Sequence, residues 1–233
     1  MKHIGIIVAA GKGKRVGGDV PKQYMKLCGK PVVFYPLKAM QESFIDEIII
    51  VVGEGYEEYV KTEIVNAFGL DKVSAIVRGG SERSDSVLNG LRAISAPEEA
   101  YVYIHDAARP MLDEALLQRL KEDVGIYGTA IASVKAKDTI KLSDDDGFIA
   151  ADIERNKAHI IQTPQVFEAG ELIGAYEKLL KTDVPVTDDS SVMEHFGSLP
   201  VHLSEGDYRN IKITTPEDFL IAEAFLKGRE WNV

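Results

Sequence analysis

The chain has 233 residues, of which 45% are hydrophobic and 27% charged, and its formal net charge is −10. These values are ordinary for a soluble globular protein, and the length fits one large α/β domain over residues 1–233. An acidic chain is unsuited to general binding of nucleic acid or of an anionic membrane, so we expect neither partner. The single cysteine, Cys28, excludes an intramolecular disulfide and a cysteine-based zinc site.

The chain has no apolar run of the roughly 18 residues that a membrane-spanning helix needs. The apolar run after Met-Lys-His is about six residues long, too short for a signal sequence, and no small-residue cleavage site follows it. A single free cysteine fits a reducing compartment. We therefore expect a cytoplasmic protein.

Strands and helices alternate along the predicted chain. β-Branched runs predict strands at Ile4–Ala9, Glu47–Val52, Val73–Val77, Tyr101–His105, Thr129–Val134 and His159–Gln162. Helical patterns lie between them at Val32–Met40, Tyr56–Ala67, Arg83–Ile94 and Asp113–Tyr127. This order predicts an α/β fold, with a mostly parallel sheet covered by helices on both faces. In such sheets, ligands bind at the carboxyl ends of the strands.

The first predicted strand leads into a loop that is rich in glycine and positive charge. The loop reads Ala-Ala-Gly-Lys-Gly-Lys-Arg from Ala9 to Arg15, and the basic residue Lys22 follows. Between Gly11 and Lys30 there are six Lys or Arg residues against one Asp. Glycines let backbone N–H groups approach an anion, and such a loop between a strand and a helix directs them at a phosphate. The loop predicts a nucleoside triphosphate site; a tight turn without a ligand is the alternative.

Two further polar motifs follow predicted strands. The segment Gly79–Ser86 opens with two glycines, which permit close approach of the backbone to a flat base, although its serines could instead cap the helix that follows. The segment His105–Pro110 contains Asp106, a natural Mg²⁺ ligand beside a triphosphate. The alternative for Asp106 is a helix N-cap before Asp113–Tyr127. Arg109 could bind an anionic group or pair with a neighbouring acid.

The segment from Lys135 to Ala158 interrupts the alternation. It predicts a β-hairpin with three aspartates and Gly147 in its turn and with little to bury beneath it. An isolated hairpin is marginal in water, so we expect this arm to pack on something, such as another subunit. Near the end of the chain, Lys212 lies in a predicted short strand, and Thr215-Pro216-Glu217-Asp218 is typical of a helix start.

Taken in order, these motifs resemble those of the 2-C-methyl-D-erythritol 4-phosphate cytidylyltransferase family. The motifs are Ala-Ala-Gly-x-Gly-x-Arg, Pro-Lys-Gln, Gly-Gly-x-x-Arg-x-Asp-Ser-Val, His-Asp-Ala-Ala-Arg-Pro, Asp-Thr-Ile-Lys, Arg-Asn, Thr-Pro-Gln, Thr-Asp-Asp and Asn-Ile-Lys-Ile-Thr-x-Pro-Glu-Asp, and they cover essentially the whole chain. The resemblance implies a Rossmann-like nucleotidyltransferase fold with a dimerising arm at about 135–158. It also implies the reaction of CTP with methylerythritol phosphate, which gives the CDP-alcohol and pyrophosphate in non-mevalonate isoprenoid synthesis.

The resemblance also implies roles for individual residues. Arg15, Lys22 and Lys212 would be catalytic, with Lys22 on the triphosphate and Lys212 on the α-phosphate, and Asp106 would bind Mg²⁺. The CTP site would be formed by Ala9, Ala10, Gly11, Gly13, Gly80, Ser81, Ser86 and Ala107. Arg109, Thr163 and Thr187 would add polar lining, and Thr139 and Arg155 in the arm would hold the sugar phosphate in the neighbouring subunit's site of a homodimer.

Three alternative functions fit these residues less well. Ribitol-5-phosphate cytidylyltransferases share the fold and most motifs, but they more often read His-Asp-Ala-Val-Arg-Pro, whereas this chain has Ala108 at the variable place. A non-catalytic nucleotide-binding regulator has less need of Arg15, Lys22, Asp106 and Lys212 together. A Rossmann dehydrogenase needs a third glycine where this chain has Val16, and no Gly-Lys-Ser/Thr of a P-loop is present.

Overall fold

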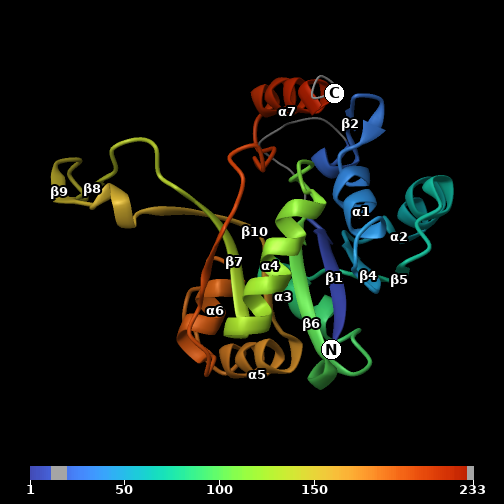
Figure 1. Cartoon of the computed structure of the whole chain (residues 1–233), viewed down its shortest axis with the longest axis horizontal. Helices are drawn as coiled ribbons and strands as arrows, with labels where there is room; N and C mark the ends of the chain where they lie inside the picture. The colour runs from blue at the N-terminus through green and yellow to red at the C-terminus, as the bar shows by residue number, and fades with distance from the viewer. Residues whose placement is uncertain (12–19, 230–233) are drawn as a thin grey trace.

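The computed structural model describes residues 1–11 and 20–229 (Figure 1). Its centre is a seven-stranded sheet in the order β11-β7-β10-β6-β1-β4-β5. These strands are β1 (Lys2–Ala9), β4 (Glu47–Val52), β5 (Val73–Arg78), β6 (Ala100–Asp106), β7 (Thr129–Lys135), β10 (His159–Glu168) and β11 (Leu203–Glu205). Only β10 is antiparallel to its neighbours, β6 and β7, and the other pairs are parallel. The predicted mostly parallel sheet is therefore confirmed.

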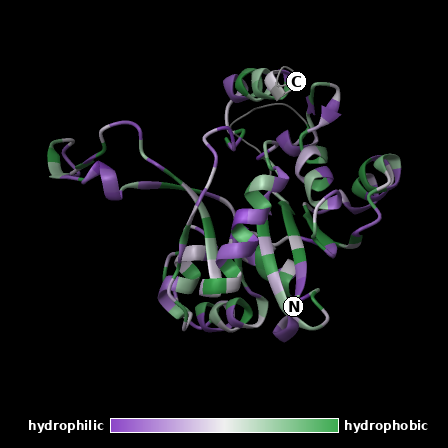
Figure 2. Ribbon diagram, viewed as in Figure 1, coloured by the Kyte–Doolittle hydropathy of each residue, from purple (hydrophilic) through white to green (hydrophobic). Residues whose placement is uncertain are grey.

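Helices cover both faces of this sheet, as the strand–helix alternation predicts. One face packs against α1 (Phe34–Gln41), α2 (Glu57–Tyr59) with its π-helical continuation η2 (Val60–Asn66), and α4 (Glu114–Tyr127). The other face packs against α3 (Arg83–Leu91), α5 (Ala169–Leu179) and α6 (Asp189–Phe196). The inner strands contain fully buried runs such as Ile48–Val52, and Figure 2 colours the inner strands largely as hydrophobic. Burial of both faces explains why these strands read as continuous apolar runs.

A third, smaller apolar cluster attaches the end of the described chain. Helix α7 (Pro216–Arg229) packs through Ala222 onto the short hairpin of β2 (Lys26–Leu27) and β3 (Lys30–Pro31), at Leu27 within β2 and Val32 just after β3. Ile213 joins the same cluster just before α7. The segment that carries Lys212 is thereby held against the turn that follows the glycine-rich loop in the sequence.

The predicted hairpin forms an arm that projects away from the sheet (Figure 1). Its strands, β8 (Lys141–Ser143) and β9 (Ile149–Asp152), pair in antiparallel fashion, and Gly147 takes a left-handed φ of 87° in the turn. Both strands are exposed along their whole length. Leu142, Phe148 and Ile149 leave 52%, 72% and 70% of their surface open to solvent, so the arm displays apolar side chains that the described core does not cover.

Two local predictions are wrong. The strand expected to end at Gln162 continues to Glu168 after an irregularity between Ile161 and Gln165, so Thr163–Gln165 lies inside a strand rather than after one. Pro164 has no N–H for the ladder, and a bulge accommodates it. Lys212 lies in an irregular segment rather than in a strand. Helices α5 and α6 and the edge strand β11 were not predicted.

Candidate active site

A cavity of about 540 Å³ lies where the carboxyl ends of β1 and β6 meet the start of α3. Val8 of β1 is in register with Asp106, the last residue of β6, so the two strand ends open at the same level. The cavity brings together ten of the predicted site residues: Ala9, Ala10, Gly11, Lys22, Gly80, Ser81, Ser86, Asp106, Ala107 and Lys212. The predicted residues Gly13 and Arg15 lie outside the described part of the chain.

The two glycines after β5 are required by close packing. A Cβ on Gly79 would lie 2.4 Å from Cβ of Ala10, and a Cβ on Gly80 would lie 2.2 Å from Cβ of Asp85. The Gly80 N–H donates to Oγ of Ser86 at 3.1 Å. The glycines thus let the start of α3 approach the end of β1 closely, which gives the cavity a wall made of backbone.

Two serines of this segment, Ser81 and Ser86, are occupied by local hydrogen bonds. Oγ of Ser86 donates to the Glu82 carbonyl at 3.0 Å, and Ser86 is almost fully buried. Oγ of Ser81 donates to Oδ2 of Asp85 at 2.6 Å, and the Glu82 N–H donates to the same oxygen at 3.1 Å. The Ser81 side chain therefore supports the start of the helix. Any contact of Ser81 with a base is left to its backbone.

Asp106 is surrounded by three positively charged side chains. Its Oδ2 accepts from Nζ of Lys212 at 2.7 Å, and its Oδ1 accepts from Nε of Arg83 at 3.2 Å. Burial by itself raises the pKa of this carboxyl. The positive charges of Arg83, Lys212 and Arg109 outweigh burial and hold the pKa of Asp106 well below its usual range. Asp106 is therefore ionised at neutral pH. The N-cap of α4 is Asp113, so the capping alternative for Asp106 is wrong.

The backbone of Asp106 is held by a buried polar chain. Its N–H donates to Oγ1 of Thr163 at 3.1 Å, and that hydroxyl lies 3.0 Å from Nδ1 of His105. Nε2 of His105 lies 3.1 Å from the Arg109 carbonyl. Because a carbonyl only accepts, Nε2 carries the hydrogen and Nδ1 accepts from Thr163. Burial lowers the pKa of His105 to about 4, so the ring is neutral and structural rather than a general base.

Arg109 takes the pairing role that the sequence left open. Its Nη1 donates to the Asn210 carbonyl at 2.7 Å, and its Nε lies 4.0 Å from Oδ2 of Asp106. Nδ2 of Asn210 donates in turn to the Thr163 carbonyl at 2.8 Å. Arg109 therefore joins the end of β6 to the segment that carries Lys212.

The two predicted catalytic lysines meet at this segment. Nζ of Lys22 donates to the Ile213 carbonyl at 2.7 Å, next to Lys212 in the chain. Both side chains line the same cavity from distant parts of the sequence. The alternative of Lys212 as a solvated strand lysine fails, because its ammonium pairs with Asp106 and only 37% of its side chain is exposed.

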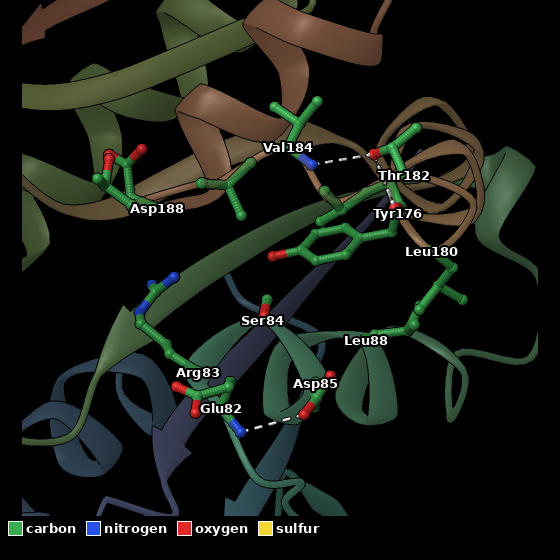
Figure 3. A pocket seen from close by; sticks show the side chains of 13 residues that line it. Glu82, Arg83, Ser84, Asp85, Leu88, Tyr176, Leu180, Thr182, Val184 and Asp188 are labelled. Atoms are coloured by element: carbon green, nitrogen blue, oxygen red, sulfur yellow. Dashed lines mark hydrogen bonds between the residues drawn. The ribbon is translucent and has the colours of Figure 1, made fainter.

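A second pocket, shown in Figure 3, adjoins the first. Its walls are Glu82, Arg83, Ser84, Asp85 and Leu88 on one side, and Tyr176, Leu180, Thr182, Val184 and Asp188 on the other. Arg83 and Glu82 line both pockets, and Thr187 lines the second. Nη2 of Arg83 also donates to the buried Asp189 at 2.8 Å. The sequence analysis assigns no role to Arg83, although Arg83 is the arginine of the Gly-Gly-x-x-Arg motif, which is the signal that points to it.

The predicted residues of the arm are distant from this cavity in sequence and are not among its lining residues. Thr139 is exposed at the base of the arm, and Arg155 is exposed in the short helical turn η4 (Arg155–Lys157). Among the described residues, no group of three or more His, Cys, Asp or Glu side chains is placed to hold a metal ion. In the same part of the chain, no helix has the length and apolar character needed to cross a membrane.

Known proteins resemble this chain over almost its whole length. The profile of the family described as 2-C-methyl-D-erythritol 4-phosphate cytidylyltransferase matches residues 3–228. Proteins of that name from Lachnoclostridium phytofermentans and Lachnospira eligens are 44% and 45% identical to it. The first alignment covers 98% of both chains, and the second covers 96% of this chain and 98% of the relative.

Solved structures agree with these sequence relatives. The crystal structure of 4-diphosphocytidyl-2C-methyl-D-erythritol synthase from Anaerococcus prevotii superposes with a TM-score of 0.85 at 33% identity, covering 97% of this chain and 96% of that one. The cytidylyltransferase of Francisella tularensis superposes with a TM-score of 0.80 at 28% identity, covering 96% and 99%. The fold is thus the Rossmann-like nucleotidyltransferase fold, and the chain belongs to the 2-C-methyl-D-erythritol 4-phosphate cytidylyltransferase family of enzymes.

Proposed function

We propose that this chain transfers the cytidylyl group of CTP to 2-C-methyl-D-erythritol 4-phosphate and releases pyrophosphate, in non-mevalonate isoprenoid synthesis. The observation that carries the proposal is the convergence of Lys22, Lys212 and Asp106 on one cavity at the carboxyl ends of β1 and β6. The family relationship over residues 3–228 supports the same reaction and favours it over the ribitol phosphate alternative.

The chemistry is an in-line displacement. An oxygen of the substrate phosphate attacks the α-phosphorus of CTP, the bond to the β-phosphate oxygen breaks, and pyrophosphate leaves. A phosphate monoester has a second pKa of about 6 and is already anionic at neutral pH, so no strong general base is needed. Catalysis is then positioning and stabilisation of negative charge. Lys22 would hold the triphosphate, and Lys212 would stabilise charge at the α-phosphate.

The cavity fits Mg²⁺ that is held jointly by protein and nucleotide. Magnesium typically takes one or two carboxylates and completes its octahedron with phosphate oxygens and water. Asp106 is an ionised carboxylate in the same cavity as both lysines, and its two oxygens offer more lone pairs than its contacts with Lys212 and Arg83 use. Asp106 would hold the ion, which would neutralise phosphate charge. Binding of the ion without nucleotide is not expected, because the described residues form no larger ligand cluster.

Release of pyrophosphate tests this function directly. The protein is incubated with CTP, Mg²⁺ and, one at a time, 2-C-methyl-D-erythritol 4-phosphate, ribitol 5-phosphate and erythritol 4-phosphate. We expect the methylerythritol phosphate to give by far the fastest release. The Lys22→Ala protein is the control for contaminating pyrophosphatase or transferase activity. If no alcohol phosphate gives more pyrophosphate than this control, the protein is better explained as a non-catalytic nucleotide-binding regulator.

The same proposal includes a homodimer in which each arm completes the neighbouring active site. The exposed Leu142, Phe148 and Ile149 give the arm an apolar surface to bury, and the tip of the arm is coloured as hydrophobic in Figure 2. A two-fold axis would let both arms make the same contact. Thr139 and Arg155 would then hold the sugar phosphate beside the partner's Asp106. The cytoplasmic location expected from the sequence stays a prediction.

A further inference from the structure

Gln23 is a buried polar residue that the mechanism above does not use. It lies between Lys22 and Tyr24 in the single helical turn η1 (Lys22–Tyr24), and only 3% of its surface is exposed. Its Nε2 donates to the Ala9 carbonyl at 2.6 Å and to the Gly11 carbonyl at 2.9 Å. Both hydrogens of the amide group are thereby used, and both acceptors belong to the segment that opens the phosphate loop.

These two hydrogen bonds fix the orientation of the backbone that faces the ligand. The peptide bond between Ala9 and Ala10 is planar and trans, so its C=O and N–H point in opposite directions. With the Ala9 carbonyl held toward Gln23, the Ala10 N–H points in the opposite direction, away from Gln23. A carbonyl oxygen close to a triphosphate would repel it, whereas an N–H attracts it. By binding the carbonyl oxygens of Ala9 and Gly11, Gln23 reduces their repulsion of the phosphates.

The turn that carries Gln23 is itself firmly anchored. The Val33 N–H donates to the Gln23 carbonyl at 2.9 Å, and the Val32 N–H donates to the Met25 carbonyl at 3.0 Å. Val32 and Val33 are completely buried. The preceding residue, Lys22, reaches the Ile213 carbonyl. One short turn thus connects the phosphate-loop backbone with the segment of Lys212.

We propose that Gln23 is a positioning residue for the triphosphate of CTP, which it serves by holding Ala9–Gly11 in the conformation that receives the phosphates. The inference rests on the proposed function, because it needs CTP as the ligand. A purely structural role for Gln23 would weaken the binding of CTP and of cytidine equally when the amide is lost. Loss of the Gln23 amide weakens binding in proportion to the phosphates of the ligand and leaves recognition of cytidine almost unchanged.

The test compares three variants with a matched control. Gln23→Met keeps the length and loses both donors, and Gln23→Glu replaces the donor group with an acceptor that repels the two carbonyls. Gln23→Asn retains the amide on a side chain one methylene shorter. Gln118→Met makes the same change on the exposed face of α4, away from the cavity. Dissociation constants for CTP and for cytidine are measured by calorimetry or NMR titration, without the second substrate.

For Gln23→Met we expect CTP binding to weaken by about tenfold or more, as for the loss of two buried hydrogen bonds, with cytidine binding changed less than about twofold. Gln23→Glu should be worse than Met, Gln23→Asn should lie between Met and the unaltered protein, and Gln118→Met should match the unaltered protein. If Met does not fold, Asn carries the same comparison. Unchanged CTP binding in the folded Gln23 variants, or equal weakening for CTP and cytidine, overturns the inference. An unaltered protein that binds no CTP overturns the proposed function itself, and the inference with it.

Discussion

His105 is expected to make the stability of this protein depend on pH in a predictable direction. The ring is fully buried between Thr163 and the Arg109 carbonyl, and burial lowers its pKa from 6.5 to about 4. In the unfolded chain the ring takes a proton below about pH 6.5, whereas in the folded protein it does not do so until about pH 4. The unfolded state therefore binds more protons between these values, and acid destabilises the fold.

The size of the effect follows from the same pKa values. One pKa unit corresponds to about 1.4 kcal/mol, so a pKa that falls from 6.5 to about 4 contributes about 3 kcal/mol of unfolding free energy. This contribution is fully present above pH 6.5 and is lost as the pH falls to about 4. By about pH 5 the loss amounts to roughly 2 kcal/mol, because the folded ring is still almost entirely neutral there.

Urea denaturation of the unaltered protein and of His105→Gln measures this difference. Gln offers an amide to the buried site but does not titrate, so subtracting the two pH profiles removes the contribution of the carboxyl groups. We expect the unfolding free energy of the unaltered protein to fall by about 2 kcal/mol more than that of the variant between pH 8 and pH 5. Parallel profiles would show that the pKa of His105 is not lowered in the folded protein.

Four further predictions concern the reaction. Lys22→Ala and Lys212→Ala should each lower kcat by on the order of 100-fold at saturating CTP, since each charge stabilises the transition state, and near-normal kcat would remove the assignment. Asp106→Asn should stay folded by circular dichroism yet lose the Mg²⁺ dependence of activity, and an unchanged Mg²⁺ titration would return Asp106 to a structural role. CTP should be strongly preferred over ATP and GTP, with UTP the better minor substrate, and equal pyrophosphate release from ATP would contradict this. Mixing inactive Lys22→Ala and Arg155→Ala proteins should restore activity to about half of one normal dimer per hybrid, and no recovery after confirmed subunit exchange would mean that each chain builds its site alone.

The sheet and the positions of its main strands could be predicted because both faces of the sheet are buried. Five of the six strands predicted in the strand–helix alternation agree with the structure to within about two residues. Continuous apolar runs such as Ile48–Val52 are stable only where both faces of the strand are buried. The exception is β10. Its apolar pattern is interrupted at Pro164, and only the pairing of Gln165–Glu168 with β6 shows that the strand resumes.

The candidate site was predictable in its residues but not in their partners. The motifs named Asp106 and Lys212 separately, whereas the 2.7 Å pair between them depends on a segment that runs from β11 back across the strand ends to α7 (Figure 1). Ile211 and Ile213 alternate with polar residues, as apolar residues do in a strand. The Ile213 N–H instead donates to the Ala108 carbonyl, and the Ile213 side chain belongs to the apolar cluster under α7. Alternation of apolar residues in the sequence cannot distinguish a strand of the sheet from an irregular segment packed under a helix.

Helices α5 and α6 each have a recognisable sequence pattern, whereas strand β11 has none. Helix α5 has Leu172, Ala175 and Tyr176 on one buried face at helical spacing. Helix α6 begins with a capping box in which the side chain of Asp188 accepts from the Ser191 N–H. The three-residue strand β11 has only one buried residue, Ser204, and is formed by pairing with β7 alone. No local pattern predicts a strand of that kind.

The proposed reaction requires that CTP and 2-C-methyl-D-erythritol 4-phosphate are the substrates. A competition assay tests it most directly: the protein receives CTP, Mg²⁺ and equal concentrations of 2-C-methyl-D-erythritol 4-phosphate and ribitol 5-phosphate, and the products are identified by ³¹P NMR and mass spectrometry. We expect 4-diphosphocytidyl-2-C-methyl-D-erythritol as the main product, with one pyrophosphate released for each molecule formed. A predominance of CDP-ribitol, or release of pyrophosphate without any CDP-alcohol, would contradict it.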